Sequence, residues 1–329
     1  MNKHIKGIRL GSVAVVAAAA LVLAGCSGSG GAGSAGSKGG SKPYIAIVSK
    51  GFSQQFWQAV KTGAEKEAKK EGARITFEGP DTESDVEQQI EQLTNVLAKN
   101  PDAIGFAALD SKAAEPLMQQ AKSNNIPVVA FDSGVDSAVP VTTAATDNKA
   151  AAAEAAKHLS ELLGGKGKVG VIVHDQTSLS GKDRRDGFID WMKKNAPGIQ
   201  LLPTQYSASD IAKAADETKA IIAANPDIKG FFGSNEASAE GVAKGIQESG
   251  KQGIAAVGFD SGQAQIDAIK SGTLAGSITQ NPIGIGQAVV KAAIKAIHGK
   301  KQPKFIDTGF YWYDKTNIDD PKIKPLLYQ

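Results

Sequence analysis

The sequence predicts an α/β fold in which parallel sheets are divided between two lobes. Short apolar runs typical of buried strands alternate with helical stretches from residue 44 to residue 298, and this alternation is typical of βαβ units. The repeats are numerous for one doubly wound sheet, and the pattern breaks near Thr143–Asp147. The tetrapeptide Phe-Asp-Ser-Gly ends a strand once in each half, at 131–134 and 259–262, which favours lobes of matching architecture.

The first 26 residues have the pattern of a secretory signal. A basic start is followed by an apolar stretch from Leu10 to Leu23, which is too short for a comfortable bilayer span. Leu-Ala-Gly-Cys then ends at Cys26, the only cysteine of the chain. This segment resembles a bacterial lipoprotein signal. We therefore expect a signal peptide over 1–25 and a diacylglyceryl membrane anchor on Cys26, where two acyl chains hold stably.

The body of the protein is expected to begin after a flexible linker. Residues 26–43 are rich in Gly and Ser and offer no apolar surface to bury. Tyr44–Val48 is then the first apolar run. Similar runs cover 103–107, 128–131, 169–173, 230–232 and 255–259, and helices are expected at 54–71, 84–99, 112–124, 147–163, 181–195, 210–224, 236–249, 262–271 and 283–298.

Composition excludes several classes of function. The net charge of +3 is small and no basic stripe is present, so a nucleic-acid partner is not expected. With four His and one Cys, a zinc site is not expected either. Gly284-Ile285-Gly286 and the glycines at 164–167 lack the spacing of dinucleotide and phosphate loops. We expect no cofactor, no metal and no enzymatic activity.

Ligands of open α/β sheets bind beyond the carboxyl ends of the strands. Asp132 and Asp260 directly follow apolar strands. Each carboxylate could accept hydrogen bonds from ligand hydroxyls, or could instead cap a helix. The same rule indicates the polar residues at 49–57, Asp110-Ser111, His174-Asp175, Ser234-Asn235-Glu236 and Gln280.

Two further motifs suit a hydroxylated ligand. Phe56-Trp57 follow a polar loop, and one of the two rings could stack on the apolar face of a sugar while the other faces the core. Arg184-Arg185 lie early in a helix. One guanidinium could offer a planar fork of donors to the gap between the lobes, and at least one is expected at the surface.

At these residues the chain resembles the type I periplasmic binding proteins of sugar transporters, the ribose-binding group. The resemblance covers residues 44–315. Ser49 to Phe56-Trp57 matches the loop that opens the first helix, and Thr146-Asp147-Asn148 matches a crossing between lobes. The remaining matches are Asp132, Arg184, Asn235, Asp260 and Gln280.

The resemblance implies two Rossmann-like lobes joined by a three-segment hinge. The crossings would lie near 146–148, near 260–263 or 280–281, and near 308–310. The first lobe would comprise 44–146 plus 281–308, and the second 147–280 plus 309–329. The lobes would close on a ligand by a population shift. The expected ligand residues are Lys50, Phe56, Trp57, Asp110, Asp132, Arg184, Asn235, Asp260 and Gln280.

The departures from the family concern the ligand. Ser133 stands where ribose binders carry Arg, Ala107-Ala108-Leu109-Asp110 replaces Asn-Pro-Thr-Asp, and Ser209 replaces Phe. Ribose itself is therefore doubtful. Lys50, Asp132-Ser133 and the stretch 78–80 look like the autoinducer-2 branch, whereas Arg184 is the sugar-binder residue.

The resemblance implies a monomeric, extracytoplasmic, lipid-anchored protein that binds a monosaccharide or polyol and delivers it to an ABC transporter permease. A receptor for autoinducer-2 or a similar furanose is the main alternative. An extracellular hydrolase is a second. A transcriptional regulator on the same core is nearly excluded, because a signal peptide occupies the place of its DNA-binding segment.

Overall fold

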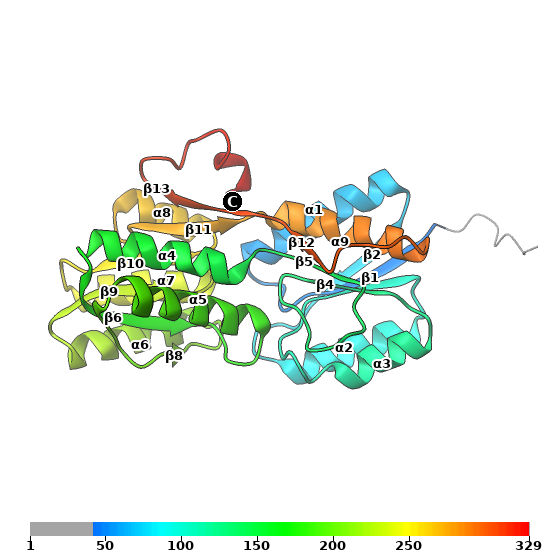
Figure 1. Ribbon diagram of the computed structural model, residues 1–329, viewed down its shortest axis with the longest axis horizontal. Helices are drawn as coiled ribbons and strands as arrows, with labels where there is room; N and C mark the ends of the chain where they lie inside the picture. Colours follow the sequence, from blue (N-terminus) through cyan, green and yellow to red (C-terminus); the bar gives the residue numbers. More distant parts are fainter. Residues whose placement is uncertain (1–41, 329) are drawn as a thin grey trace, which may run out of the picture. The chain divides into compact units, whose positions relative to one another are not determined.

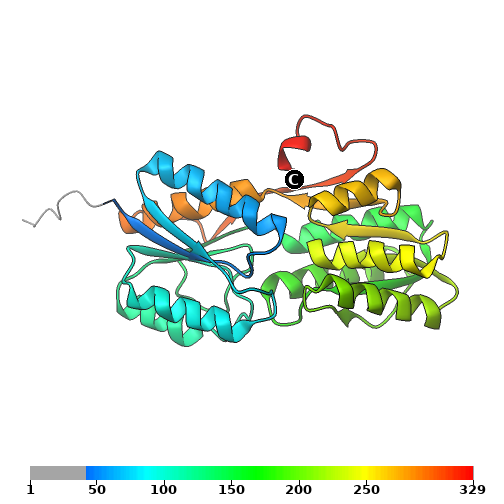
Figure 2. The same ribbon diagram turned by 180° about the vertical axis from the view of Figure 1, so that it is seen from behind.

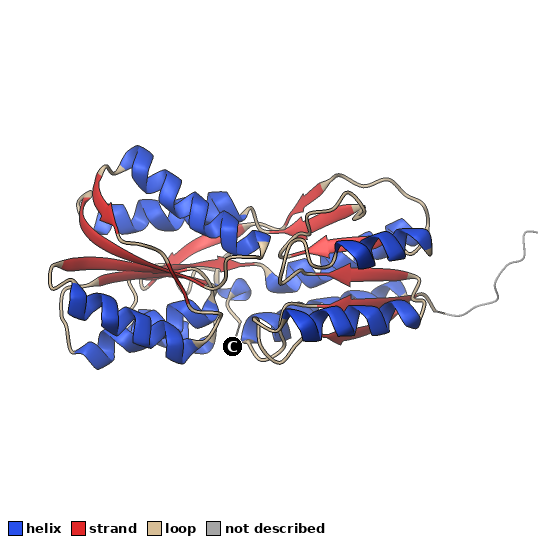
Figure 3. Ribbon diagram, turned by 90° about the horizontal axis from the view of Figure 1, so that it is seen from below, coloured by secondary structure: helices blue, strands red, loops and turns tan. Residues whose placement is uncertain are grey.

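The computed structural model describes residues 42–328. The strands form two sheets, each covered on both faces by helices (Figures 1 and 3). We call each sheet with its helices a lobe. The two-lobed α/β architecture expected from the sequence is therefore confirmed.

The first lobe contains a sheet of six parallel strands in the order β12-β5-β4-β3-β1-β2. Apolar residues fill the centre of this sheet, because helices cover both of its faces. Its elements are β1 (Tyr44–Val48), α1 (Gln55–Glu71), β2 (Arg74–Glu78), α2 (Val86–Ala98), β3 (Ala103–Phe106), α3 (Glu115–Ser123), β4 (Val128–Phe131), β5 (Thr142–Ala145), α9 (Pro282–Ile297) and β12 (Phe305–Asp307).

Helices α1 and α9 lie side by side on one face of this sheet although they are far apart in sequence (Figure 2). Glycines allow their close approach. A Cβ atom on Gly63 would overlap the carbonyl oxygen of Ile283, and a Cβ atom on Gly286 would overlap that of Val60. The contact between the two helices therefore depends on backbone meeting backbone.

The second lobe contains a seven-stranded sheet in the order β13-β11-β10-β9-β6-β7, with β8 also paired to β6. Helices α4 and α5 cover one face, and α6, α7 and α8 cover the other. Its elements are α4 (Asn148–Leu162), β6 (Lys166–Val173), α5 (Leu179–Asn195), β7 (Gly198–Leu201), β8 (Gln205–Tyr206), α6 (Ile211–Ala224), β9 (Ile228–Gly233), α7 (Glu236–Ser249), β10 (Ala255–Phe259), α8 (Gln263–Ser271), β11 (Gly276–Gln280) and β13 (Phe310–Asp314), followed by the 3₁₀ turn η1 (Lys324–Leu326).

The second sheet departs from the expectation of parallel strands at one edge. β13 pairs antiparallel with β11, from Gly276 opposite Asp314 to Gln280 opposite Phe310. The chain arrives from β12 of the other sheet through only two residues, Thr308 and Gly309. β12 ends at the carboxyl end of β5, and the first residue of β13 pairs with the last residue of β11. The chain therefore enters the second sheet at the carboxyl end of its strands and runs against β11.

The chain passes between the two sheets at three places. It leaves the first sheet after β5 and enters α4 of the second lobe at 146–147. It returns between β11 and α9 at Asn281, and it crosses once more between β12 and β13. Of the two positions expected for the middle crossing, the structure has the one at 280–281, because α8 packs on α7 within the second lobe.

The C-terminal segment contributes to both lobes. Tyr328 packs in the apolar cluster of the first lobe, with its ring 6.0 Å from that of Phe56. Its hydroxyl accepts a hydrogen bond from the backbone N–H of Ser261 in the second lobe, at 3.0 Å. Tyr328 thus contacts both lobes, whereas the expected boundaries place 309–329 with the second lobe.

Cys26, the expected signal peptide and the linker up to residue 41 lie outside the described residues. Within 42–328, no helix is both long enough and apolar enough to cross a membrane.

We expect Gly63→Ala and Gly286→Ala each to lower the free energy of unfolding by about 2 kcal/mol or more, because the added methyl group forces α1 and α9 apart. Urea unfolding monitored by circular dichroism measures this loss. Lys66→Ala, at an exposed position of α1, is the control and should change stability by less than about 0.5 kcal/mol. Equal stability of all three variants would contradict the close contact.

Candidate ligand-binding site

A small cavity lies where the carboxyl ends of strands from both sheets meet. Its empty volume is ≈ 220 Å³. Lys50 follows β1, Asp132 follows β4, Asp260 follows β10 and Gln280 ends β11. The lining residues are Lys50, Gln54, Phe56, Trp57, Glu83, Asp132, His174, Arg184, Asn235, Asp260 and Gln280. Both lobes contribute to this set.

All of the expected ligand residues except Asp110 line this cavity. The Asp110 carboxylate instead accepts hydrogen bonds from the backbone N–H groups of Lys112 and Ala113, at 2.8 and 3.0 Å. A strand-end Asp either faces a ligand or caps the turn that follows it. At Asp110 the structure shows the capping arrangement.

Asp132 and Asp260 occupy equivalent positions in the two lobes. Each follows its strand directly and has positive φ, 53° at Asp132 and 82° at Asp260. Positive φ is unfavourable for a residue other than glycine. Each backbone N–H is nevertheless held by the neighbouring strand, at 3.0 Å from Ala144 O and 2.6 Å from Ile278 O. The repeated Phe-Asp-Ser-Gly therefore marks a repeated local structure.

Arg184 lies between these two carboxylates. Its Nη2 is 4.0 Å from Asp132 Oδ1, and its Nη1 is 3.8 Å from Asp260 Oδ2. Its Nε donates to Asn148 Oδ1 at 2.7 Å, and its guanidinium stacks over the ring of Phe259 at 3.8 Å. The planar group is thus fixed on several sides, as suits a buried guanidinium.

Arg185 is the Arg of the pair that faces away from the cavity. Its Nε donates to Asp186 at 2.7 Å, and its Nη1 donates to Tyr206 at 3.1 Å. The expectation that one of the two arginines is a surface residue agrees with this arrangement.

The acidic groups of the cavity are only partly balanced by cations. Burial raises the pKa of Asp132 to about 6, although Lys50 and Arg184 oppose the shift. Burial also raises the pKa of Asp260, again against the charge of Arg184. Glu83 adds a third carboxylate, whereas Lys50 and Arg184 are the only lining cations. With its carboxyl groups ionised, the cavity therefore carries more negative than positive charge.

Glu83 was not among the expected ligand residues. It lies in the loop between β2 and α2 and connects the two lobes. Trp57 Nε1 donates to one of its carboxylate oxygens, and Ser209 Oγ donates to the other at 2.8 Å. Asn235 Nδ2 lies 3.5 Å from the same second oxygen. No pattern predicts this residue, because β2 is only half-buried and its apolar residues do not stand out.

Lys50 and His174 lie with Glu83 at one end of the cavity. Lys50 Nζ donates to Ser180 Oγ at 3.2 Å and lies 3.7 Å from Asp175 Oδ2 and 4.0 Å from Glu83 Oε2. His174 and Asp175 directly follow β6 and belong to the strand-end polar residues that the sequence indicates, but His174 is not among the expected ligand residues. Gln54, from the loop before α1, is the other lining residue that was not expected.

Phe56 and Trp57 both line the cavity. Their rings meet edge to face with centroids 4.9 Å apart. Trp57 is oriented by its bond to Glu83, and Phe56 by Tyr328 behind it. The cavity thus combines aromatic rings with carboxylates and fixed donors, as small polar ligands require.

A second set of contacts joins the lobes beside the cavity. The Glu236 carboxylate, from α7, accepts hydrogen bonds from the first two N–H groups of α1, at Gln55 and Phe56, both at 3.0 Å. In return, Gln55 Oε1 accepts from the N–H of Gln263 at the start of α8, at 2.7 Å. Each lobe thereby caps a helix of the other. Burial, with the nearby Asp260, raises the pKa of Glu236 to about 8.

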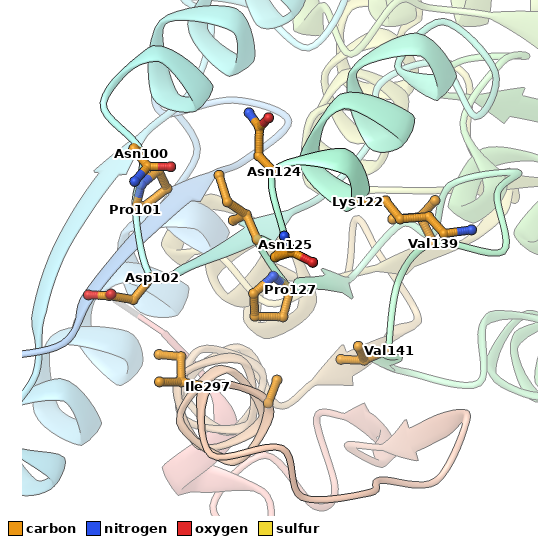
Figure 4. A pocket seen from close by; sticks show the side chains of 12 residues that line it. Asn100, Pro101, Asp102, Lys122, Asn124, Asn125, Pro127, Val139, Val141 and Ile297 are labelled. Carbon is orange, nitrogen blue, oxygen red and sulfur yellow. The ribbon is translucent and has the colours of Figure 1, made fainter. Parts of the chain in front are cut away.

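A larger hollow in the first lobe is a poorer candidate for a site. It has an empty volume of ≈ 1080 Å³ and lies at the amino ends of β3 and β4, beside Asp102 and Pro127 (Figure 4). Ligands of α/β sheets bind at the opposite end of the strands. Asp102 is moreover already bonded to the N–H of Tyr44 at 2.8 Å.

The cavity has the features of a binding site for a small hydroxylated molecule. Residues 42–328 contain no group of three or more His, Cys, Asp or Glu side chains placed to hold a metal ion. The polar groups converge from two lobes and are buried, so a ligand there would be enclosed by protein. Enclosure favours selectivity, because a wrong ligand would leave buried groups unpaired.

Comparison with known families gives one match over most of the chain: the periplasmic binding protein domain, over residues 45–301. The D-allose-binding periplasmic protein of Escherichia coli is 30% identical over 260 residues, covering 76% of this chain and 83% of that protein. The ribose import binding protein of Bacillus subtilis is 27% identical over 82% of this chain and 86% of its own length.

Solved structures agree with this match. A solute-binding protein of an ABC transporter from Agrobacterium vitis with bound D-fucose superposes with a TM-score of 0.84 and 36% identity, covering 87% of this chain and all of that one. Another solute-binding protein from the same organism, with bound α-D-tagatopyranose, has a TM-score of 0.84 and is 33% identical. The match covers 88% of this chain and all of that one.

We expect Arg184→Met to lower the free energy of unfolding by about 3 kcal/mol or more at pH 7, because it leaves two buried carboxylates without their cation. The loss should be smaller at pH 5, where those carboxyls take up protons more readily. Urea unfolding at both pH values measures it. The control Arg185→Met removes a more exposed ion pair and should lose no more than about 1 kcal/mol. Similar losses for the two variants would contradict the buried charge arrangement.

Proposed function

The chain belongs to the periplasmic binding protein domain family, and we propose that it binds a monosaccharide or related polyol in the cavity between its lobes. Proteins of this family bind solutes outside the cytoplasm and are not enzymes. The relatives include a ribose import binding protein and a solute-binding protein of an ABC transporter. We therefore infer that this protein delivers the bound sugar to a transporter permease.

One observation carries the proposal: Asp132, Asp260 and Arg184 converge from both lobes on a small buried cavity beside two aromatic rings. Carboxylates accept hydrogen bonds from adjacent hydroxyls, and a guanidinium donates to them. An aromatic ring suits the apolar face of a sugar.

We further propose that the three crossings between the sheets act as a hinge. Gln280 supports this assignment, because it stands next to one crossing and contacts the site. Its Nε2 donates to Asp260 Oδ1 at 2.7 Å, and its Oε1 accepts from Thr146 Oγ1, beside another crossing, at 2.8 Å. The reciprocal helix caps of Glu236 and Gln55 would then form as the lobes meet and would stabilise the closed form.

Membrane attachment through a diacylglyceryl group on Cys26, and a monomeric state, complete the proposal. The membrane attachment rests on the Leu-Ala-Gly-Cys motif, and the monomeric state rests on the family resemblance. Both are inferred from the sequence alone. The autoinducer-2 alternative rests on Lys50 and on Asp132-Ser133. The relatives and the sugar-bound structures support the sugar-binding function over that alternative.

The proposal predicts that a simple sugar stabilises the protein. We expect at least one of D-ribose, D-allose, D-fucose, D-tagatose, D-arabinose and xylitol to raise the melting temperature, since a ligand that binds only the folded state adds about 2.7 kcal/mol at 100 times its Kd. Asp260→Asn should abolish the effect. The control Asp110→Asn should retain it, because that carboxylate lies outside the cavity.

If no panel member alters the melting temperature at millimolar concentration, and none is detected by calorimetry, sugar binding is refuted. Loss of binding in Asp110→Asn would show instead that the site extends further than the cavity.

Sugar affinity should fall as the pH falls through about 6. Ligand hydroxyls that donate to Asp132 stabilise its charged form and so lower its pKa from about 6. Binding therefore releases a proton below that pH, and affinity at pH 5 should be about tenfold lower than at pH 7. Titration calorimetry in two buffers of different ionisation enthalpy measures both effects.

Asp132→Asn is the control for this pH dependence. This variant should bind the sugar more weakly at pH 7 than the unaltered protein does. Its affinity should, however, change less between pH 7 and pH 5. An unchanged pH dependence would assign the effect to another group.

A further inference from the structure

His174 is the one lining side chain whose polar atom is buried and has no partner among the described residues. The residue is 1% exposed. Its Nε2 has no hydrogen-bond partner in residues 42–328, although Asp175 Oδ2 lies 3.4 Å away. Buried polar atoms almost always have partners, so an unpartnered one at a binding cavity requires an explanation.

The neighbours of His174 determine which ring nitrogen carries the proton. Ser234 Oγ accepts the backbone N–H of His174 at 2.9 Å and lies 2.7 Å from Nδ1. The Ser234 hydroxyl proton has no other acceptor among the described residues, so it is directed to Nδ1. With Nδ1 as acceptor, the neutral ring carries its proton on Nε2.

Burial, assisted by the neighbouring cations, keeps this ring neutral. Burial, together with the positive charges of Lys50 and Arg184, lowers the pKa of His174 well below its ordinary value, against the influence of Asp175. His174 therefore supplies an N–H donor to the cavity without adding a charge.

We propose that His174 is a specificity-determining residue that donates a hydrogen bond from Nε2 to one oxygen of an uncharged sugar or polyol. This inference rests on the proposed function and deepens it. Lys50 lies at the same end of the cavity between two carboxylates, with its Nζ 4.0 Å from Glu83 Oε2, which lines the cavity, and 3.7 Å from Asp175 Oδ2. This end therefore selects a hydroxyl, which accepts from His174 and donates to a carboxylate.

The charge balance of the cavity restricts the ligand class further. Three lining carboxylates face two lining cations, and both cations are already engaged with protein carboxylates. A uronate or a sugar phosphate would bring additional negative charge without a free cation to meet it. Neutral sugars and polyols satisfy the acceptors without this penalty.

Two substitutions of His174 separate its two nitrogens. Asn places an amide near the position of Nδ1 and leaves nothing at Nε2, whereas Gln extends an N–H donor toward the position of Nε2. For the panel sugar that binds best, we expect His174→Asn to lower affinity 10- to 100-fold, as for a lost hydrogen bond in a buried site. His174→Gln should lose less than fivefold. His158→Asn, at a histidine outside the cavity, should bind unchanged.

Monodeoxy derivatives of that sugar identify the oxygen that His174 contacts. The unaltered protein should discriminate strongly against one derivative, and His174→Asn should discriminate little against the same one, which is the signature of direct coupling. Proton-detected ¹⁵N spectra should show a neutral Nε2–H form of His174 whose signal shifts on binding. D-glucuronate and D-ribose 5-phosphate should not bind.

The outcomes distinguish the inference from the proposed function. If the unaltered protein binds no panel sugar, the proposed function fails and the inference fails with it. If it binds a sugar, but His174→Asn keeps the same affinity and the same ranking of deoxy derivatives, only the inference is overturned. Should His174→Asn not fold, the unaltered protein decides: an Nε2–H signal of His174 that does not shift when the sugar binds would overturn the inference. Binding of D-glucuronate would overturn the restriction to uncharged ligands.

Discussion

The architecture of the site depends on burying several carboxylates at the junction of two sheets with too few cations to neutralise them. Arg184 is central to this arrangement, because it lies within 4.0 Å of both Asp132 and Asp260. A buried charge needs partners, and the protein supplies them from both lobes. If the charged groups of one lobe were removed, those of the other lobe would be left buried without a partner. The charge balance of the site therefore depends on how the two lobes are placed.

This link continues from the site to the contacts between the lobes. Asp260 accepts hydrogen bonds from Gln280 at 2.7 Å and from the backbone N–H of Glu236 at 3.0 Å. Gln280 bonds to Thr146 near a crossing, and the Glu236 side chain caps α1 of the first lobe. A group that alters the charge or position of Asp260 therefore acts on both sets of contacts. Asp260 is therefore the residue that joins the cavity to the contacts between the lobes.

Sequence reasoning was most successful where a strand ends in a single polar residue. Asp132 and Asp260 could be identified because each directly follows a run of consecutive apolar residues. The repeated tetrapeptide corresponds to a repeated backbone conformation, in which each Asp has positive φ. Asp110 stands at a similar strand end, but its carboxylate is used by the following turn. Local sequence does not distinguish these two uses, since both place Asp directly after a strand.

Other features depend on contacts that no local pattern records. Glu83 lies in a loop after a half-buried strand, and it reaches Ser209 and Asn235 only because the lobes meet. β13 is antiparallel because the chain, coming from β12, enters the second sheet at the carboxyl end of β11. Both are consequences of long-range geometry.

His174 shows how a strand-end residue can be recognised yet undervalued. A histidine beside an aspartate suggests acid–base chemistry, and without a nucleophile that hypothesis ends. The structure changes the question, because Ser234 holds Nδ1, and burial together with Lys50 disfavours a second proton on the ring. What remains is a neutral donor in a cavity lined by three carboxylates and two cations. Such a donor contributes little to affinity through charge, but it can distinguish sugars that differ in a single hydroxyl, since the wrong sugar would leave a buried N–H without an acceptor.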